Sequence, residues 1–205
     1  MGQATDLYAK GVAAAESYLR GRDLWDDDVL VGYRLGVVGD EHFPEHRHVV
    51  GRLAIPYLTP GGVVNMKFRC IEDHDCKAEE HAKYLGTVGA EDRLYNVQAL
   101  HDADDTIYVT EGELDAITAT VAGFPAVGIS GASKWADHYG KLFEDFAEVI
   151  VLGDGDAAGE KFADMVLREV EHARPVFMPD DEDVNSVVVE FGDKRLREII
   201  EEAKR

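Results

Sequence analysis

The strongest constraint on the fold of this chain is the alternation of short apolar segments with longer helical segments after about residue 105. Runs rich in Val and Ile predict buried strands, and the segments between them predict helices. The expected strands cover Thr106–Thr110, Ala126–Ser130, Val149–Gly153 and Pro175–Met178. The expected helices cover Leu114–Ala122, Trp135–Phe146 and Ala157–Ala173, followed by helical residues to the C-terminus. This pattern predicts an α/β fold in which helices flank both faces of a mostly parallel sheet.

The first half of the chain predicts a smaller α+β region that precedes this sheet. The expected elements are a helix over residues 5–20, a short helix over residues 29–38, antiparallel strands over Arg47–Pro56 and Val63–Ile71, and a loop over residues 72–82. The two strands are separated by a turn sequence, Thr59-Pro60-Gly61-Gly62. We therefore expect two domains, residues 1–104 and residues 105–205.

The net charge of −20 argues at first against a nucleic-acid partner, because phosphate binding needs Lys and Arg. Residues 46–71 depart from this average, because they contain Arg47, Arg52, Lys67 and Arg69 and no Asp or Glu. Salt screens charges beyond about 8–10 Å, so a local basic groove can coexist with an acidic remainder.

Nothing in the sequence indicates a membrane or secretory protein. No apolar run reaches the length of about 18 residues that suggests a membrane span, and the N-terminus lacks a signal-peptide pattern. The chain has only two cysteines, Cys70 and Cys76, which suggests a reducing compartment. We therefore expect a cytoplasmic protein, including the cytoplasm of a phage-infected cell, with no membrane partner.

Three of the expected strands end in acidic residues, and the carboxyl ends of parallel strands meet at one edge of a sheet. The first expected strand is followed by Glu111 and, one helical turn later, by Asp115. The third is followed by Asp154 and Asp156, and the fourth by an acidic run that ends in Asp183. Carboxylates gathered at one edge repel one another, and a hard divalent cation such as Mg²⁺ would compensate the repulsion. For a single acid a structural role stays open, and Asp156 could simply cap the helix that begins near Ala157.

At these residues the sequence resembles the TOPRIM domain shared by primases, type IA and type II topoisomerases and some nucleases. The matching segments are Glu111-Gly112-Glu113-Leu114-Asp115-Ala116 and the more specific Val151-Leu152-Gly153-Asp154-Gly155-Asp156-Ala157-Ala158-Gly159. The resemblance implies three catalytic residues: Glu111 as general acid/base or phosphate-orienting carboxylate, with Asp154 and Asp156 binding the divalent metal. Asp183-Val184-Asn185 resembles the third acidic motif of phage primases. The expected metal ligands are therefore Glu111, Asp115, Asp154, Asp156 and Asp183. The expected metal is Mg²⁺, with Mn²⁺ as a substitute.

The rest of the chain resembles bacterial and phage primases in particular. The segments similar to their basic subdomain are Gly51–Tyr57, Lys67-Phe68-Arg69, Lys83-Tyr84-Leu85 and Leu94-Tyr95-Asn96, and Gly131–Trp135 resembles one of their loops. The resemblance implies a DNA primase, a nucleotidyltransferase that copies a single-stranded DNA template into short RNA primers from ribonucleoside triphosphates. The residues expected to bind the nucleotide and the template are Arg52, Lys67, Arg69, Lys83 and Lys134.

Two features common in replication primases are missing from the sequence. There is no N-terminal zinc ribbon, and Cys70 and Cys76 with His74 and His81 do not have a standard structural zinc spacing, so we expect a polar loop there instead of a zinc site. There is also no P-loop, and therefore no fused helicase motor. We expect a separate replicative helicase as a partner, together with a zinc-binding module on another chain or a different means of selecting the start site.

Three other functions stay open. A TOPRIM nuclease would use the same metal and carboxylates to cut phosphodiesters. A non-catalytic TOPRIM module would only bind DNA or a replication partner, although a pure binder has little need for Glu111, Asp154 and Asp156 together. Another type of nucleotide-binding α/β domain is disfavoured, because no Gly-rich phosphate loop follows the first strand.

Overall fold

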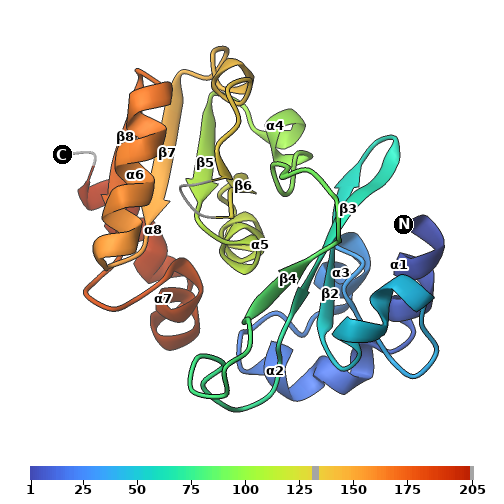
Figure 1. The fold of residues 1–205 in the computed structure, drawn as a ribbon. Helices are drawn as coiled ribbons and strands as arrows, with labels where there is room; N and C mark the ends of the chain where they lie inside the picture. The colour runs from blue at the N-terminus through green and yellow to red at the C-terminus, as the bar shows by residue number, and fades with distance from the viewer. Residues whose placement is uncertain (131–133, 204–205) are drawn as a thin grey trace. The chain divides into compact units, whose positions relative to one another are not determined.

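The computed structural model describes residues 1–130 and 134–203, and the chain divides into two compact units, residues 1–91 and 92–205 (Figure 1). The division lies before the boundary expected at residue 104. Residues 92–104 belong to the second unit because Tyr95 forms a β-bridge with Gly128, and Leu94 joins the core of that unit. The first three residues of the expected loop Gly131–Trp135 lie outside the described residues.

The first unit is built on an antiparallel sheet with strand order β1-β2-β3-β4. Its strands are β1 (Gly36–Val37), β2 (Leu53–Thr59), β3 (Gly62–Arg69) and β4 (Tyr84–Gly86). The expected antiparallel pair is confirmed, and its register sets Ile55 opposite Lys67. The first part of the strand expected over Arg47–Pro56 is wrong, because a 3-10 helix, η2, occupies Pro44–Val49. The short strands β1 and β4 were not expected, and β1 lies where the end of the short helix over residues 29–38 was expected.

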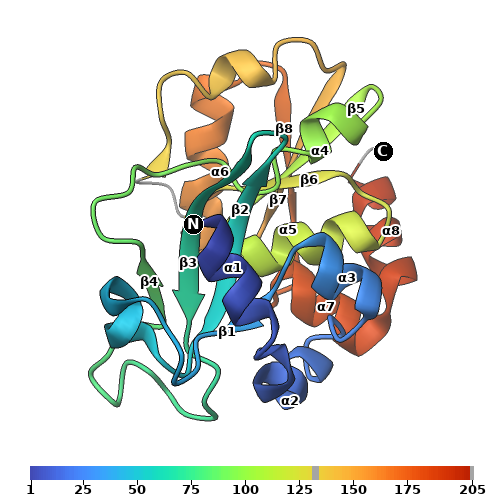
Figure 2. The ribbon, with the colours of Figure 1, turned by 90° about the vertical axis from the view of Figure 1, so that its right-hand side faces the viewer.

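The helices of the first unit are α1 (Gly2–Ala9), η1 (Val12–Ala15), α2 (Glu16–Arg20) and α3 (Asp27–Gly32). One continuous helix over residues 5–20 was wrong, because the chain passes so close to β1 at Gly11 that a Cβ there would lie 2.9 Å from the Val37 carbonyl oxygen. Helix α1 lies across β2 and β3 (Figure 2) and buries Tyr8 against Phe68 and Met66.

The second unit contains a parallel sheet with strand order β6-β5-β7-β8, as the alternating pattern predicted. Its strands are β5 (Thr106–Thr110), β6 (Ala126–Gly128), β7 (Glu148–Gly153) and β8 (Ala173–Phe177). Thr110 pairs with Leu152, and Leu152 pairs with Val176, so β5, β7 and β8 end at nearly the same level. The carboxyl ends of three neighbouring strands therefore form one rim.

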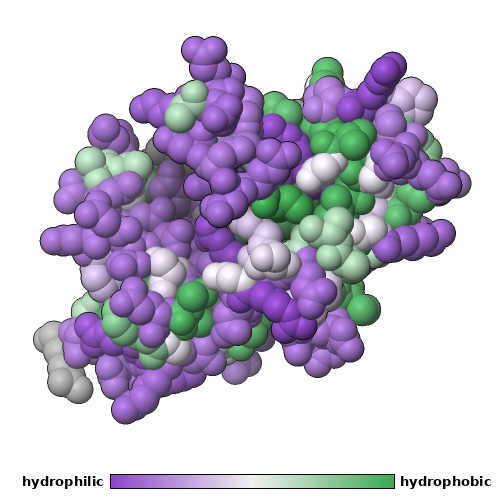
Figure 3. Space-filling model, turned by 90° about the horizontal axis from the view of Figure 1, so that it is seen from below, coloured by the Kyte–Doolittle hydropathy of each residue, from purple (hydrophilic) through white to green (hydrophobic). Residues whose placement is uncertain are grey.

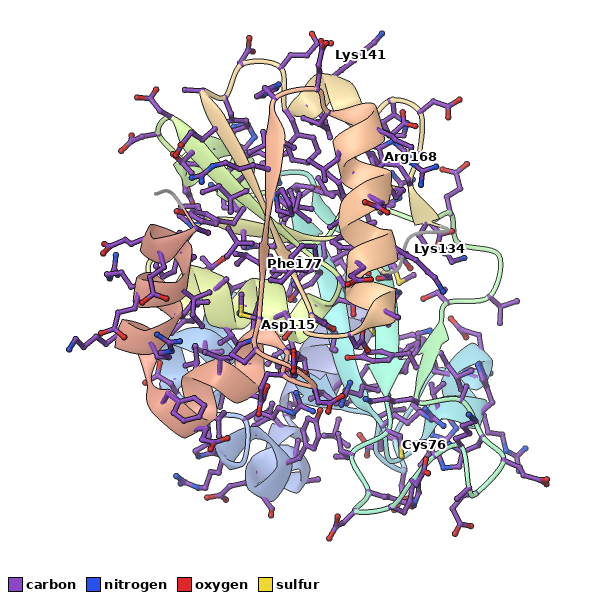
Figure 4. All side chains as sticks on the ribbon, turned by 90° about the vertical axis from the view of Figure 1, so that its left-hand side faces the viewer. Cys76, Asp115, Lys134, Lys141, Arg168 and Phe177 are labelled. Atoms are coloured by element: carbon purple, nitrogen blue, oxygen red, sulfur yellow. The ribbon has the colours of Figure 1, made fainter. Side chains whose placement is uncertain are left out.

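Helices cover both faces of the parallel sheet. They are α4 (Ala99–Asp102), α5 (Glu113–Val121), α6 (Ala157–Glu169), α7 (Val184–Phe191) and α8 (Asp193–Glu202). Ile107 and Val109 of β5 share a core with Phe162 and Val166 of α6. Figure 4 views the sheet from one edge, with α6 on the right and α7 and α8 on the left.

The helix expected over Trp135–Phe146 was wrong. The described part of this segment contains a single 3-10 turn, η4 (Gly140–Leu142). Trp135, Tyr139 and Phe143 repeat every four residues as on a helix, but in the structure they form an aromatic cluster, with the Trp135 ring centroid 5.8 Å from Tyr139 and 6.2 Å from Phe143. The spacing of these aromatic residues therefore led to the wrong prediction of a helix.

Hydrophilic residues cover most of the face shown in Figure 3, in keeping with a chain in which 30% of residues are charged. Among the described helices, none combines the length and the hydropathy that crossing a membrane would require.

The loops that follow β7 and β8 approach each other very closely at Gly155. A Cβ at this position would lie 1.8 Å from the Pro179 carbonyl oxygen, and the Gly155 N–H donates to the Glu182 carbonyl at 2.8 Å. A distance of 1.8 Å is far below van der Waals contact, and both atoms would belong to backbone. A side chain at residue 155 must therefore push the two loops apart.

We expect Gly155→Ala to lower the free energy of unfolding by about 1–3 kcal/mol, the size of effect seen when the backbone must move to relieve overpacking. Urea unfolding followed by circular dichroism measures the change. Gly39→Ala is the matched control, because a Cβ at Gly39 meets nothing within 4 Å. Equal stability of the two variants would show that the close approach of the two loops is wrong.

Candidate active site

The rim at the carboxyl end of the parallel sheet gathers acidic residues from separate segments. Glu111 directly follows β5, Asp154 directly follows β7, and Asp183 follows the loop after β8. Because β5, β7 and β8 are adjacent and parallel, these positions lie at the same end of the sheet. The expected convergence of acids at one edge is therefore present in the fold.

Backbone hydrogen bonds hold the loops after β7 and β8 together. The Gly155 carbonyl accepts from the Asp181 N–H at 2.9 Å, and the Gly153 carbonyl accepts from the Met178 N–H at 2.9 Å. These bonds continue the contact of β7 with β8 beyond the sheet. They bring the acidic run that ends in Asp183 next to Asp154.

Three of the acids also have structural partners. Asp156 caps α6, since its Oδ1 accepts from the N–H groups of Ala158 and Gly159 at 2.8 Å each. Asp183 caps α7 in a capping box with Ser186. Asp115 lies in the first turn of α5, and its Oδ1 accepts from the Asn185 N–H at 3.1 Å. Figure 4 shows Asp115 at the end of the sheet.

Asp154 lies at the electrostatic centre of the rim. Burial raises the pKa of Asp154 to about 8, and the negative charges of four other carboxylates add to this shift, in the order Asp115, Glu111, Asp183 and Asp156. Each carboxylate makes ionisation of Asp154 more costly. All five acids expected at the metal site are thus close enough to interact.

Glu111 is the second perturbed carboxylate. Burial, and then the charge of Asp156, raises the pKa of Glu111 above its usual range. Its Oε2 is buried and has no hydrogen-bond partner among the described residues. A buried acceptor without a donor is costly, and a cation at the rim would remove that cost.

These residues fit a hard divalent cation. The donor set consists of carboxylate oxygens, which Mg²⁺ prefers, and the crowded charges need a positive partner. Mg²⁺ retains several waters and is held directly by only one or two carboxylates, so the five acids need not all contact the ion.

Comparison with known proteins supports this interpretation of the rim. A family model described as Toprim-like matches residues 108–188. The Gene 57 protein of Mycobacterium phage D29 is 39% identical over 155 residues, covering 73% of this chain and 98% of the phage protein. The RNA polymerase domain of the Mycobacterium tuberculosis primase DnaG, solved with double-stranded DNA, matches with a TM-score of 0.77 and 23% identity over 97% of this chain and 78% of its own.

The chain belongs to the Toprim family, with the fold of a primase catalytic core. The DNA primase of Escherichia coli K12 is 31% identical over 121 residues. This alignment covers 54% of this chain but only 20% of the bacterial enzyme, so the matched part of the chain spans about a fifth of that primase.

We call the second unit, residues 92–205, the Toprim unit. Two of its polar residues were not among the expected site residues. Glu113 is buried, and its Oε1 accepts from the Ser130 hydroxyl, which follows β6 at the same rim. Asn185 is also buried, and its Nδ2 donates to the Thr118 hydroxyl at 2.8 Å. The sequence carried a signal for both, because Glu113 stands between two acids of the Toprim motif and Asn185 follows Asp183.

The basic residues expected to bind nucleotide and template belong to different units. Arg52, Lys67, Arg69 and Lys83 are part of the first unit. Lys134 is part of the Toprim unit, and its Nζ lies 2.9 Å from Asp92 Oδ2 in an exposed salt bridge. The groove that these residues were expected to line with the acidic rim stays a prediction.

Two of these basic residues have structural contacts. Arg69 is only 6% exposed, and its guanidinium lies 5.4 Å from the ring centroid of Tyr18 and 4.8 Å from that of Tyr84. Arg52 donates from Nη1 to the Ala82 carbonyl at 2.9 Å. The placement of Arg69 favours a role in packing over contact with a phosphate, whereas Lys83 is exposed.

We expect Asp154→Asn to stabilise the metal-free protein at pH 8 by on the order of 1–3 kcal/mol, a value reduced to allow for solvent screening. The folded pKa of about 8 lies above that of an unfolded chain, about 4, so Asp154 destabilises the folded state increasingly as pH rises from about 4 to about 8. Asparagine keeps the shape without the charge. Urea unfolding in EDTA at pH 8 measures the gain.

The gain must shrink at pH 5, where Asp154 of the wild-type protein is already protonated. The matched control is Asp164→Asn, which removes an exposed carboxylate from α6. A stability gain that is the same at both pH values, or the same for both variants, would contradict the crowding of charge around Asp154.

Proposed function

We propose that this protein is a DNA primase that synthesises short RNA primers on a single-stranded DNA template from ribonucleoside triphosphates. The observation that carries the proposal is the interaction of Asp154 with four other carboxylates at the carboxyl end of a Toprim sheet. A primase-type fold and 31% identity to a curated DNA primase add support. The proposed enzyme class is a DNA-directed RNA polymerase.

The rim residues divide the chemical work. Asp154 and Asp156 would hold Mg²⁺ directly, and Asp115 and Asp183 would complete the site directly or through water. Bound Mg²⁺ supplies charge neutralisation for the triphosphate and activation of the attacking hydroxyl. Glu111, a carboxylate whose pKa is raised by burial, would take the proton from the primer 3′-hydroxyl.

The first unit would supply the contacts to phosphate. Lys67 and Lys83 lie on β3 and directly before β4, where the sequence resembles the basic subdomain of primases. Arg52 and Arg69 would act mainly by fixing this surface, because each is engaged within its unit. Lys134 would reach the nucleotide after releasing its exposed salt bridge with Asp92, which costs little.

The proposed partners are the DNA template, a replicative helicase and a zinc-binding module on another chain. The proposal of a DNA template is supported by the similar primase domain from Mycobacterium tuberculosis, which was solved in complex with double-stranded DNA. A Toprim nuclease is the competing enzyme, because it would use the same acidic rim on the same substrate backbone.

We expect the full chain with Mg²⁺ to incorporate labelled ribonucleotides into short products on single-stranded DNA. Asp154→Ala should lower this synthesis by at least about 10²-fold, the usual cost of removing one key electrostatic group. Asp164→Ala should retain synthesis. EDTA should abolish synthesis, and excess Mg²⁺ or Mn²⁺ should restore it. Cut template without extended products would instead identify a nuclease.

We also expect Lys83→Ala to weaken binding to single-stranded DNA and to reduce the slope of log K against log salt by about 1, as removing one phosphate contact does. Fluorescence anisotropy with a labelled oligonucleotide at several salt concentrations measures both quantities. Lys10→Ala is the control, because Lys10 is an exposed cation of the same unit outside the expected surface. Equal slopes for both variants and the wild type would remove Lys83 from the template surface.

A further inference from the structure

The strongest unassigned feature is a group of Cys and His residues between β3 and β4. Cys70 directly follows β3, and His74, Cys76 and His81 lie in the irregular segment that precedes β4. One ligand atom from each residue lies within 4.8 Å of all the others, and none of the four residues is exposed. We propose that Cys70, His74, Cys76 and His81 bind a structural Zn²⁺ ion, separate from the acidic rim of the Toprim unit.

The donor atoms face one another as zinc ligands do. The Nε2 atoms of His74 and His81 are 2.7 Å apart, and the Cys70 Sγ lies 3.5 Å from His74 Nε2. A tetrahedral zinc centre with bonds of about 2.0–2.3 Å sets its ligand atoms about 3.3–3.8 Å apart. The observed spacing therefore needs only small side-chain movements to enclose the ion.

The histidine rings meet edge to face, with centroids 4.7 Å apart and an interplanar angle of 74°. This arrangement turns two imidazole nitrogens towards a single point. Two unmetallated imidazoles could share only one proton there, whereas zinc would accept a lone pair from both rings. A slight separation of the two rings would therefore let one zinc ion replace the hydrogen bond between them.

The second nitrogen of the His74 ring has a partner of the kind found behind zinc ligands. The Nδ1 of His74 lies 3.4 Å from Glu72 Oε2, an acceptor that keeps the proton on Nδ1 and leaves Nε2 free to bind the metal. The Nδ1 of His81 lies 3.2 Å from the Ala82 carbonyl oxygen and 3.3 Å from Arg52 Nη2, which can only donate. Zinc binding through Nε2 of His81 would therefore select the bond from its Nδ1–H to the Ala82 carbonyl over the contact with Arg52 Nη2. Arg52 Nη1 bonds to the same Ala82 carbonyl, which helps to fix the segment.

The chemistry of the donors selects zinc over magnesium. Two thiolates and two imidazoles are soft or borderline ligands that suit Zn²⁺, whereas Mg²⁺ requires oxygen. On binding, each thiol would lose its proton to solvent and form a Zn–S bond. A pocket of about 330 Å³, lined by residues that include His74, Cys76 and His81, gives the ion access from solvent.

A metal would also explain how this segment is ordered. Residues 72–82 contain no helix or strand and little apolar surface to bury. Zinc would join the end of β3 to the start of β4, where the Cys70 N–H donates to the Lys83 carbonyl at 2.9 Å. The ion would then set the position of Lys83 and β4. The sequence-based expectation of an incidental polar loop missed this convergence.

We expect the purified full chain to contain about one zinc ion per chain by mass spectrometry of metals. After zinc removal, Co²⁺ should produce the visible bands of tetrahedral coordination and a thiolate-to-cobalt absorption. The chain has only two cysteines, so this absorption reports on Cys70 and Cys76 alone. Absence of zinc together with absence of the cobalt spectrum overturns the proposal, as does a disulfide between Cys70 and Cys76 in freshly purified protein.

Variants separate this site from the acidic rim. Cys76→Ser should lose bound zinc and the thiolate absorption, and Glu72→Gln should lower zinc affinity about 10–100-fold through its partner His74. Lys77→Ala, next to a proposed ligand, and Asp154→Asn, at the acidic rim, should both retain one zinc. If Cys76→Ser fails to fold, the cobalt spectrum of the wild-type chain still decides. Zinc retained by Cys76→Ser, or lost in Asp154→Asn, overturns the assignment.

Discussion

Repulsion among the carboxylates at the end of the parallel sheet is the constraint on which the rest of the Toprim unit depends. Four other acids interact with a half-buried Asp154, although burial and like charge both oppose its ionisation. A chain free to relax would move these groups apart. The fold prevents this with backbone: three parallel strands end together, and Gly155 lets the loops after β7 and β8 bind each other at 2.8 Å. A bound cation would offset the free energy that this repulsion costs.

Structural and chemical roles coincide in the same acids. Asp156 caps α6, Asp183 caps α7, and Asp115 accepts from the backbone of Asn185. These bonds fix carboxylates that would otherwise turn outward into water. Asp156, for instance, uses one oxygen as a cap and has a second oxygen to offer to a metal. The presence of an N-cap therefore does not count against a role in binding the ion; it supplies the rigidity that such a role needs.

The sequence predicted what depends on local pattern and on general rules of topology. Runs of Val and Ile located the strands of the parallel sheet, and the rule for parallel strand ends predicted that Glu111 and Asp154 would meet. Prediction from the sequence failed where contacts between residues far apart in the chain determine the local structure. Gly11 interrupts a helix because it meets Val37, and Trp135 follows helical spacing without forming a helix. The convergence of Cys70 and His81 likewise arises from the pairing of β3 with β4, which their separation in sequence does not reveal.

The two candidate metal sites differ in a way that keeps their occupants apart. The acidic rim offers only carboxylate oxygen, which suits a hard ion that keeps several of its waters and also binds the substrate phosphates. The Cys and His group offers sulfur and nitrogen at close range, which suits a softer ion that stays in place. A chain with 41 acidic residues will attract divalent cations over much of its surface. Selectivity must then come from donor type and spacing, because net charge alone cannot distinguish magnesium from zinc.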